Sequence, residues 1–183
     1  MFLSVKAVTG CLMLLFPLAV FYGYPDFEPR NIAGTLMVLL AVRLVSGFSA
    51  RHWSMPLLIV GIGFCGFAIW SNQLHVLRFY PVLVNAVMLW VFGWSLVSPP
   101  SLVERLARLQ QPNLPAEGIV YTRRVTKIWC GFFILNGAIA LATSLWASLA
   151  VWSLYNGLLA YLLMGLLMGS EYLIRKRTQT YAR

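Results

Sequence analysis

The fold of this chain is decided by residues 121–177, which read YTRRVTKIWCGFFILNGAIALATSLWASLAVWSLYNGLLAYLLMGLLMGSEYLIRKR. Two apolar runs are separated by a short turn between Trp146 and Trp152, and clusters of Lys and Arg flank the pair. A helix needs about 20 mostly apolar residues to cross the hydrocarbon core of a bilayer, and cytoplasmic loops are enriched in Lys and Arg. The stretch therefore predicts a membrane hairpin with both ends in the cytoplasm and with Trp146 and Trp152 at the opposite surface.

The composition of the whole chain indicates one integral membrane domain over residues 1–183. Of the 183 residues, 60% are hydrophobic and only 10% are charged, whereas about a quarter of a soluble domain is charged. Such a chain has too little polar surface to cover a globule in water. The net charge of +9 is ascribed to loops that face an anionic membrane leaflet, and nucleic acid is not expected as a partner because no nucleic-acid-binding motif is present.

The apolar runs predict an all-α membrane protein with six transmembrane helices. Prolines interrupt the sequence between several of these runs, and proline disfavours a helix before it and removes a backbone donor. The six predicted spans are residues 5–24, 32–49, 55–71, 80–98, 128–147 and 151–173. Residues 99–127 form the one long cytoplasmic loop, and residues 174–183 form a cytoplasmic tail.

The distribution of Lys and Arg among the loops predicts the orientation. With the amino terminus inside, eleven of these residues lie on the inner side, whereas Arg30 and Arg78 lie on the outer side. Arg43 is left out because it lies within a span. This asymmetry follows the positive-inside rule and predicts that both termini are cytoplasmic.

The first half of the long loop has the pattern of a short amphipathic helix over residues 101–109. Ser101 with Glu104 three residues later is a capping box, and Glu104 and Arg108 form a pair one helical turn apart. Leucines repeat at helical spacing at Leu102, Leu106 and Leu109. Two interpretations stay open: a connector that lies on the inner membrane surface, or a docking surface for a cytosolic partner. The cations that would serve docking are Arg105, Arg108, Arg123 and Arg124.

The main ionisable residue inside an apolar span is Arg43. It lies 8 residues before Arg51, so about 12 Å from the inner end of its helix. Ionisable groups inside a membrane are costly and are functional candidates for that reason. Arg43 could instead snorkel to the interface or form an ion pair with Glu171 at the inner end of the last span. A structural role and a contact with a substrate or lipid headgroup both stay open.

Three asparagines and a threonine form a second polar group. Asn85 and Asn156 each lie about 6–8 Å below the outer aromatic residues, and Thr143 comes to a similar depth. Asn136 lies deeper, about 15 Å in. Amide side chains in membrane helices usually bridge neighbouring helices, and the alternative is a polar binding site in the outer half of the membrane.

Small residues repeat along the last span at Gly157, Gly165 and Gly169. Gly165 and Gly169 form a GxxxG pair, which lets two helices approach closely. The stripe predicts close packing, either within the bundle or between two copies in a homodimer.

The sequence contains no recognised arrangement of catalytic residues. There is no Ser-His-Asp set, no HExxH, no P-loop and no pair of acids within the spans. Cys11, Cys65 and Cys130 stand singly in or beside apolar runs, as small hydrophobic residues do. We therefore expect no catalytic residue, no metal site and no cofactor, and we expect membrane lipids as the surrounding partner.

Six short segments carry a family resemblance: Tyr80–Asn85, Val103–Arg108, Tyr121–Thr126, Phe132–Gly137, Tyr155–Gly157 and Glu171–Tyr172. Through them the chain resembles a family of uncharacterised bacterial inner-membrane proteins found beside aryl-polyene-type and fatty-acid-type biosynthesis genes. The resemblance implies a location in the bacterial inner membrane and a role near lipid or polyene assembly, close to acyl-carrier proteins, ketosynthases and acyltransferases. Members are sometimes labelled ketosynthases, but this chain lacks the cysteine and histidine arrangement of a ketosynthase.

Three functions are weighed. The first is a non-catalytic membrane protein that supports lipid or aryl-polyene-type acyl-chain assembly at the cytoplasmic leaflet, with its basic inner face docking an acidic acyl-carrier protein. The second is a small lipid or polyene transporter or flippase, motivated by Arg43 and by the polar outer level. The third is a membrane-embedded enzyme of lipid metabolism, which would need an essential ionisable residue. The first is favoured.

Overall fold

The computed structural model describes residues 28–45, 55–109 and 111–180. These residues form helices joined by turns: α3 (Pro29–Val45), α4 (Met55–Ser71), α5 (Leu74–Arg78), α6 (Tyr80–Val97), α7 (Leu102–Ala107), α8 (Ala116–Trp146), α9 (Leu149–Leu154), the π-helix η1 (Tyr155–Leu159) and α10 (Ala160–Thr180). The prediction of an all-α fold is confirmed for this part of the chain. The first predicted span, residues 5–24, lies outside the described residues.

Three helical segments are long and apolar enough to cross a membrane: Leu74–Val97, Ala116–Trp146 and Leu149–Leu173. They correspond to the fourth, fifth and sixth predicted spans. Two further apolar helices, Pro29–Val42 and Leu58–Ser71, are shorter. These lengths and compositions indicate a membrane protein.

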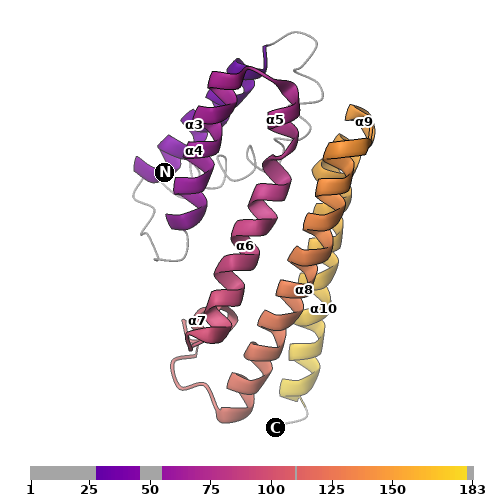
Figure 1. Ribbon diagram of the computed structural model, residues 1–183. Coiled ribbons are helices and arrows are strands. Elements are labelled where there is room, and N and C mark those ends of the chain that lie inside the picture. Colours follow the sequence, from indigo (N-terminus) through magenta and orange to yellow (C-terminus); the bar gives the residue numbers. More distant parts are fainter. Residues whose placement is uncertain (1–27, 46–54, 110, 181–183) are drawn as a thin grey trace.

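The long helices make a bundle with two distinct ends (Figure 1). Helix α6 packs along α8, and α7 lies beside the start of α8 at one end, which we call the α7 end. The turn from α8 into α9 and η1 lies at the other end, called the α9 end. Helices α8 and α10 approach again near the α7 end, where the hydroxyl of Tyr121 donates to the carbonyl oxygen of Glu171 at 3.5 Å.

The short helices α3 and α4 pack against each other as a pair. The end of α4 is tied to the start of α3, because the side-chain oxygen of Asn72 accepts a hydrogen bond from the backbone N–H of Arg30 at 3.0 Å. Asn72 has a φ of 49°, a left-handed conformation that Asn tolerates better than most residues. This pair contacts the bundle through α4 and α6.

Helix α8 is longer than the sequence pattern predicts. It begins at Ala116, directly after Pro115, so residues 116–127 of the predicted loop are helical and continuous with the fifth predicted span. The charge of Glu117 in the first turn is favourable at a helix amino terminus, and the long side chains of Arg and Lys favour helix. The basic cluster therefore lies on a continuous helix. Similarly, α10 continues through the predicted tail to Thr180.

Trp152 lies in the core of the protein. It is 0% exposed and belongs to a cluster that joins α9 to the short helices, with Leu36, Cys65 and Leu77 among its members. Trp146 is 81% exposed. Both tryptophans lie at the α9 end, but the prediction of an exposed aromatic residue is wrong for Trp152, because the chain turns at the end of α8 and places this indole against α3, α4 and α5.

A second core lies between α6, α7 and α8. It contains Val91, Phe92, Leu102 and Phe133. The rings of Phe92 and Phe133 meet edge to face with centroids 5.1 Å apart, an arrangement that aromatic pairs prefer. This core fixes α7 against the α7 end of the bundle.

The start of α7 is capped from another helix. Ser101 occupies the N-cap position, but its side chain makes no capping bond, so the prediction of a capping box is wrong. The hydroxyl oxygen of Ser95 in α6 instead accepts from the backbone N–H of Leu102 at 2.9 Å. Leu102 is buried in the second core, which holds the first turn of α7 against α6.

The leucine pattern of α7 does not form one buried face. Leu102 is buried, whereas Leu106 and Leu109 are exposed. The predicted pair of Glu104 and Arg108 is confirmed, since Nη2 of Arg108 lies 2.8 Å from Oε1 of Glu104. Glu104 is buried, and a buried carboxylate is strongly unfavourable without such a partner. Arg108 is thus part of the α7 structure.

Candidate functional site

Buried polar side chains connect α5, α6, α8 and the α9–η1 turn at the α9 end. Arg78, the last residue of α5, is 8% exposed. Its Nη2 donates to the backbone carbonyl oxygen of Thr143 at 2.7 Å and to that of Ala147. These acceptors lie in the last turn and at the C-cap of α8, where helical carbonyls run out of backbone donors and a positive charge is favourable. Arg78 therefore caps the carboxyl end of α8.

The backbone carbonyl oxygen of Arg78 is an acceptor in the same group. It receives hydrogen bonds from Ser144 Oγ at 2.7 Å and from Trp152 Nε1 at 3.0 Å. Arg78 therefore does not lie in an exposed loop, because both its charge and its carbonyl are used inside the protein. The sequence carried no signal for this role, since the partners of the guanidinium are backbone carbonyls that every residue has.

A series of side-chain hydrogen bonds connects three helical segments near Arg78. Asn85 of α6 donates to the carbonyl oxygen of Pro81 at 2.8 Å, and its side-chain oxygen accepts from Nδ2 of Asn136 in α8 at 3.0 Å. The oxygen of Asn136 in turn accepts from the hydroxyl of Tyr155 at 2.9 Å. Both asparagines are buried. These hydrogen bonds connect α6 to α8 and α8 to η1.

A second bridge joins α8 to η1. Nδ2 of Asn156 donates to Thr143 Oγ1 at 3.2 Å and to the carbonyl oxygen of Trp152 at 2.9 Å. A side chain that bonds to a carbonyl four residues earlier competes with the helical backbone ladder, and the backbone here takes the wider π form. Single π turns inside helices occur frequently at functional sites. The segment Tyr155–Leu159 is thus the least regular part of the hairpin.

Two buried polar atoms of this group have no hydrogen-bond partner within the described residues: Oδ1 of Asn156 and Nε of Arg78. Each belongs to a residue that also contacts Thr143, through its hydroxyl or its carbonyl. One atom is an acceptor and the other a donor. An unpaired buried polar atom costs about 1–3 kcal/mol, so these two atoms make this level of the bundle less stable than fully paired groups would.

The structure divides the predicted outer level into two pairs. Thr143 and Asn156 meet, as their similar depth predicts, whereas Asn85 pairs with the deeper Asn136. Helix rise along single spans could not show this, because it ignores how far one helix is shifted along the next. Gly137 makes the second pair possible: a Cβ at this position would lie 3.1 Å from Cβ of Asn85, so α6 and α8 approach closely there.

Two sequence candidates, Arg43 and Glu171, are only partly described. Arg43 lies in α3, but its side chain is outside the described part, and so is the predicted pair with Glu171. The backbone carbonyl of Glu171 accepts from Tyr121, as noted above.

The glycine stripe of the last span is divided between interior and surface. Gly157 is buried in η1, whereas Gly165 and Gly169 are exposed, with no described atom within 4 Å of a Cβ added at either position. Of the two predicted kinds of packing, contact within the described bundle applies to Gly157 alone.

The four predicted docking arginines differ in their environment. Arg105 donates to the carbonyl oxygens of Pro100 and Ser98, and Arg123 donates to that of Leu96. Arg108 is held by Glu104, as described above. Arg124 is exposed and has no side-chain hydrogen bond or ion pair within the described residues. Three of the four cations therefore bind other groups at the α7 end, and Arg124 is the one whose side chain has no such bond within the described residues.

The chemistry of the site is that of hydrogen bonding. Its donors and acceptors are amides, hydroxyls, backbone carbonyls and one guanidinium, which suits helix bridging and the binding of a polar group. In the described ranges, no three of His, Cys, Asp and Glu gather at metal-binding distance. Comparisons with family models, with curated proteins and with solved structures found no match to this chain. The fold and the site together define an all-helical protein of membrane type with a polar layer at the α9 end. We use this name for the hydrogen-bonded residues described above: Arg78, Asn85, Asn136, Thr143, Ser144, Tyr155 and Asn156.

Proposed function

We propose that this chain is a non-catalytic, multi-pass protein of the bacterial inner membrane that supports lipid or aryl-polyene-type acyl-chain assembly at the cytoplasmic leaflet. The family resemblance of the sequence supports the location in the bacterial inner membrane and the link to acyl-chain assembly. The proposal includes six transmembrane helices, with the α7 end and both termini in the cytoplasm.

The distribution of charge between the two ends supports the orientation. At the α7 end the exposed cations are Arg105, Arg123, Arg124 and Lys127. At the α9 end, Arg78 turns its charge into the protein. Arg30 is exposed but forms an ion pair with Glu28. Among the described residues the exposed cations without an acidic partner thus lie at the α7 end, and under the positive-inside rule this supports a cytoplasmic α7 end.

The observation that carries the docking function is the pair Arg124 and Lys127. Both are exposed on α8, three residues apart and therefore on neighbouring positions of one helix face, and neither has a side-chain bond within the described residues. Acyl-carrier proteins are acidic as a class, and complementary charge raises the rate and specificity of encounter. We therefore assign carrier docking to Arg124 and Lys127, and a structural role to Arg108.

Charge reversal separates these roles. The Arg124→Glu, Lys127→Glu double variant should lose co-purification with an acyl-carrier protein, because two attractive contacts become repulsive, and wild-type binding should weaken as salt is raised. The matched control is Arg124→Lys, Lys127→Arg, which keeps the charge and should keep binding. Salt-insensitive binding, or binding that survives the charge reversal in a folded protein, contradicts the proposal.

A second candidate function is transport of a lipid or polyene. It is favoured by the unpaired Asn156 Oδ1 and Arg78 Nε in the polar layer. The two functions predict different deletion phenotypes. Loss of the lipid product supports a role in assembly, and normal synthesis with the product retained in the wrong membrane supports transport.

A further inference from the structure

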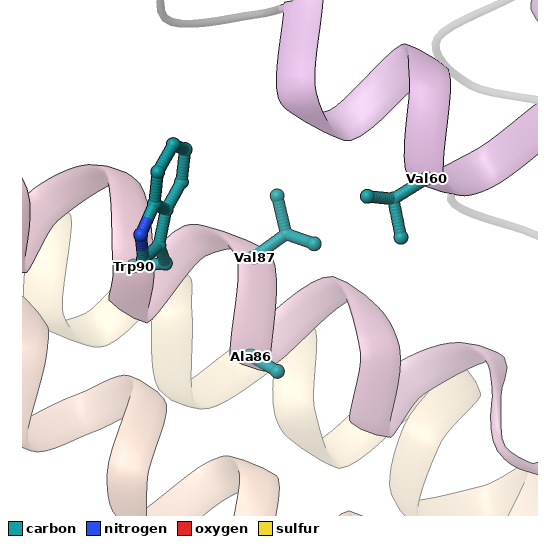
Figure 2. Close-up of a pocket in the computed structure, with 4 residues that line it drawn as sticks. All are labelled: Val60, Ala86, Val87 and Trp90. Carbon is teal, nitrogen blue, oxygen red and sulfur yellow. The ribbon is translucent and has the colours of Figure 1, made fainter.

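An apolar hollow of about 370 Å³ lies between α4 and α6. Its lining is Val60 from α4 and Ala86, Val87 and Trp90 from α6. Figure 2 shows Val60 and Val87 on facing helices across this space, with the ring of Trp90 beside it. Apart from the indole nitrogen, the lining side chains consist of carbon. A polar ligand would find almost no hydrogen-bond partner here, whereas a hydrocarbon chain would make contacts throughout.

The apolar surface continues from the hollow toward the α7 end of α6. Trp90 and Trp94 are 55% and 58% exposed, and their rings stack with centroids 6.4 Å apart. Val97 is 76% exposed, and its spacing from Ala86 places it on the same side of the helix. From Ala86 to Val97 the helix rises about 16 Å, close to the ~15 Å of hydrocarbon in one leaflet. The length of this face suits one acyl chain.

Two arginines are fixed where this face ends. Nε of Arg105 donates to the carbonyl oxygen of Pro100 at 2.7 Å and its Nη2 to that of Ser98 at 3.1 Å, while Nη2 of Arg123 donates to that of Leu96 at 3.2 Å. Both residues are exposed. A guanidinium has five N–H donors, so each keeps donors for an anion, and phosphate is a preferred partner of Arg.

We propose that this face of α6 binds an anionic membrane lipid, with one acyl chain along Val97, Trp94 and Trp90 into the hollow and its phosphate at Arg105 and Arg123. The argument is one of complementarity, since an apolar face one leaflet deep ends at two positively charged groups. The inference rests on the proposed membrane placement. It deepens the proposed function, because it identifies an anionic lipid as a ligand of a protein proposed to support acyl-chain assembly.

Photocross-linking of the full-length protein in vesicles tests the site. The vesicles contain phosphatidylethanolamine with a trace of phosphatidylglycerol that carries a photoreactive group on one acyl chain, or the same trace of photoreactive phosphatidylethanolamine. We expect cross-links in the peptides that contain Val60 and Trp90. The yield with phosphatidylglycerol should exceed that with phosphatidylethanolamine by about fivefold for each arginine that contacts the phosphate.

Substitutions in the hollow, at the phosphate site and on α8 test whether the cross-links report the proposed site. Ala86→Phe fills the hollow and should reduce the cross-link at Val60 severalfold, whereas Ala138→Phe, the same change at an exposed position of α8, should leave it unchanged. Arg123→Gln should reduce only the preference for phosphatidylglycerol, by about fivefold. A Cys at Val97 that forms disulfides with another chain, or with a Cys placed in residues 1–27, would show that protein occupies this face.

The proposal is overturned by protein at this face, by equal yields with the two lipids, or by an Ala86→Phe variant that folds and cross-links as wild type does. Carrier co-purification is measured on the same preparations. If the wild-type protein gives the expected cross-links but does not bind the carrier protein, the docking function is refuted and the lipid site is not. The two failures are therefore distinguishable.

Discussion

The guanidinium of Arg78 lies 2.7 Å from the backbone carbonyl oxygen of Thr143, a residue 65 positions later in the chain. This contact joins the short helix α5 to the last turn of α8. The carbonyl of Arg78 accepts from Trp152, one element further on. A single residue thus orders the α9 end, on which the polar layer depends.

Removal of the Arg78 side chain should destabilise the protein more than removal of any exposed cation. Arg78→Ala leaves the carbonyl of Ala147 without its partner and opens a buried space, for an expected loss of about 3 kcal/mol of unfolding free energy. Arg124→Ala, at an exposed site, should stay within about 0.5 kcal/mol. Unfolding in detergent micelles measures both, and equal stabilities for the two variants would show that Arg78 is not a structural clamp.

The bond between Asn85 and Asn136 should appear as a coupling energy. In a double-mutant cycle of Asn85→Ala and Asn136→Ala, we expect about 0.6–1.7 kcal/mol of interaction, the range found for hydrogen bonds between membrane helices. Tyr155→Phe should couple to Asn136→Ala but not to Arg124→Ala. Strictly additive effects of the two Asn variants would mean that the bond contributes nothing.

Two glycines of α8 provide a matched test of close packing. Gly137→Ala places a Cβ 3.1 Å from Cβ of Asn85, so α6 and α8 must separate slightly, and we expect a loss of about 1–3 kcal/mol. Gly131→Ala meets no described atom within 4 Å and should be neutral or stabilising by up to ~1 kcal/mol, because Ala favours helix. The same sign for both substitutions would argue against a tight contact at Gly137.

The orientation can be measured with single cysteines. In a background in which the native cysteines are replaced by Ala, Asn113→Cys lies between α7 and α8, and Ala150→Cys lies in the first turn of α9; both positions are exposed. A membrane-impermeant maleimide should label Ala150→Cys on intact cells and Asn113→Cys only after permeabilisation. The reverse pattern would invert the proposed topology and remove the basis for docking at the α7 end.

Part of the candidate site could be predicted from the sequence. Polar residues inside apolar runs are conspicuous, so Asn85, Asn136, Thr143 and Asn156 were identified as a group. Their pairing was predicted only in part, because it depends on how far α6 is shifted along α8. Arg78 was missed altogether, since a single cation between two apolar runs has the same sequence pattern whether it faces water or caps a buried helix end.

The sequence by itself determined the all-α class and most of the long helices, because the apolar content of a 20-residue window is a local property and membrane spans require it. It also determined the pair of Glu104 and Arg108, which lie on one helix a turn apart. Only the tertiary structure decided that Trp152 is buried, that Ser95 caps α7 and that Arg78 caps α8. These contacts join residues from different helices, two of them through backbone carbonyls and one through a backbone N–H. Residue spacing along one helix contains no information about such partners.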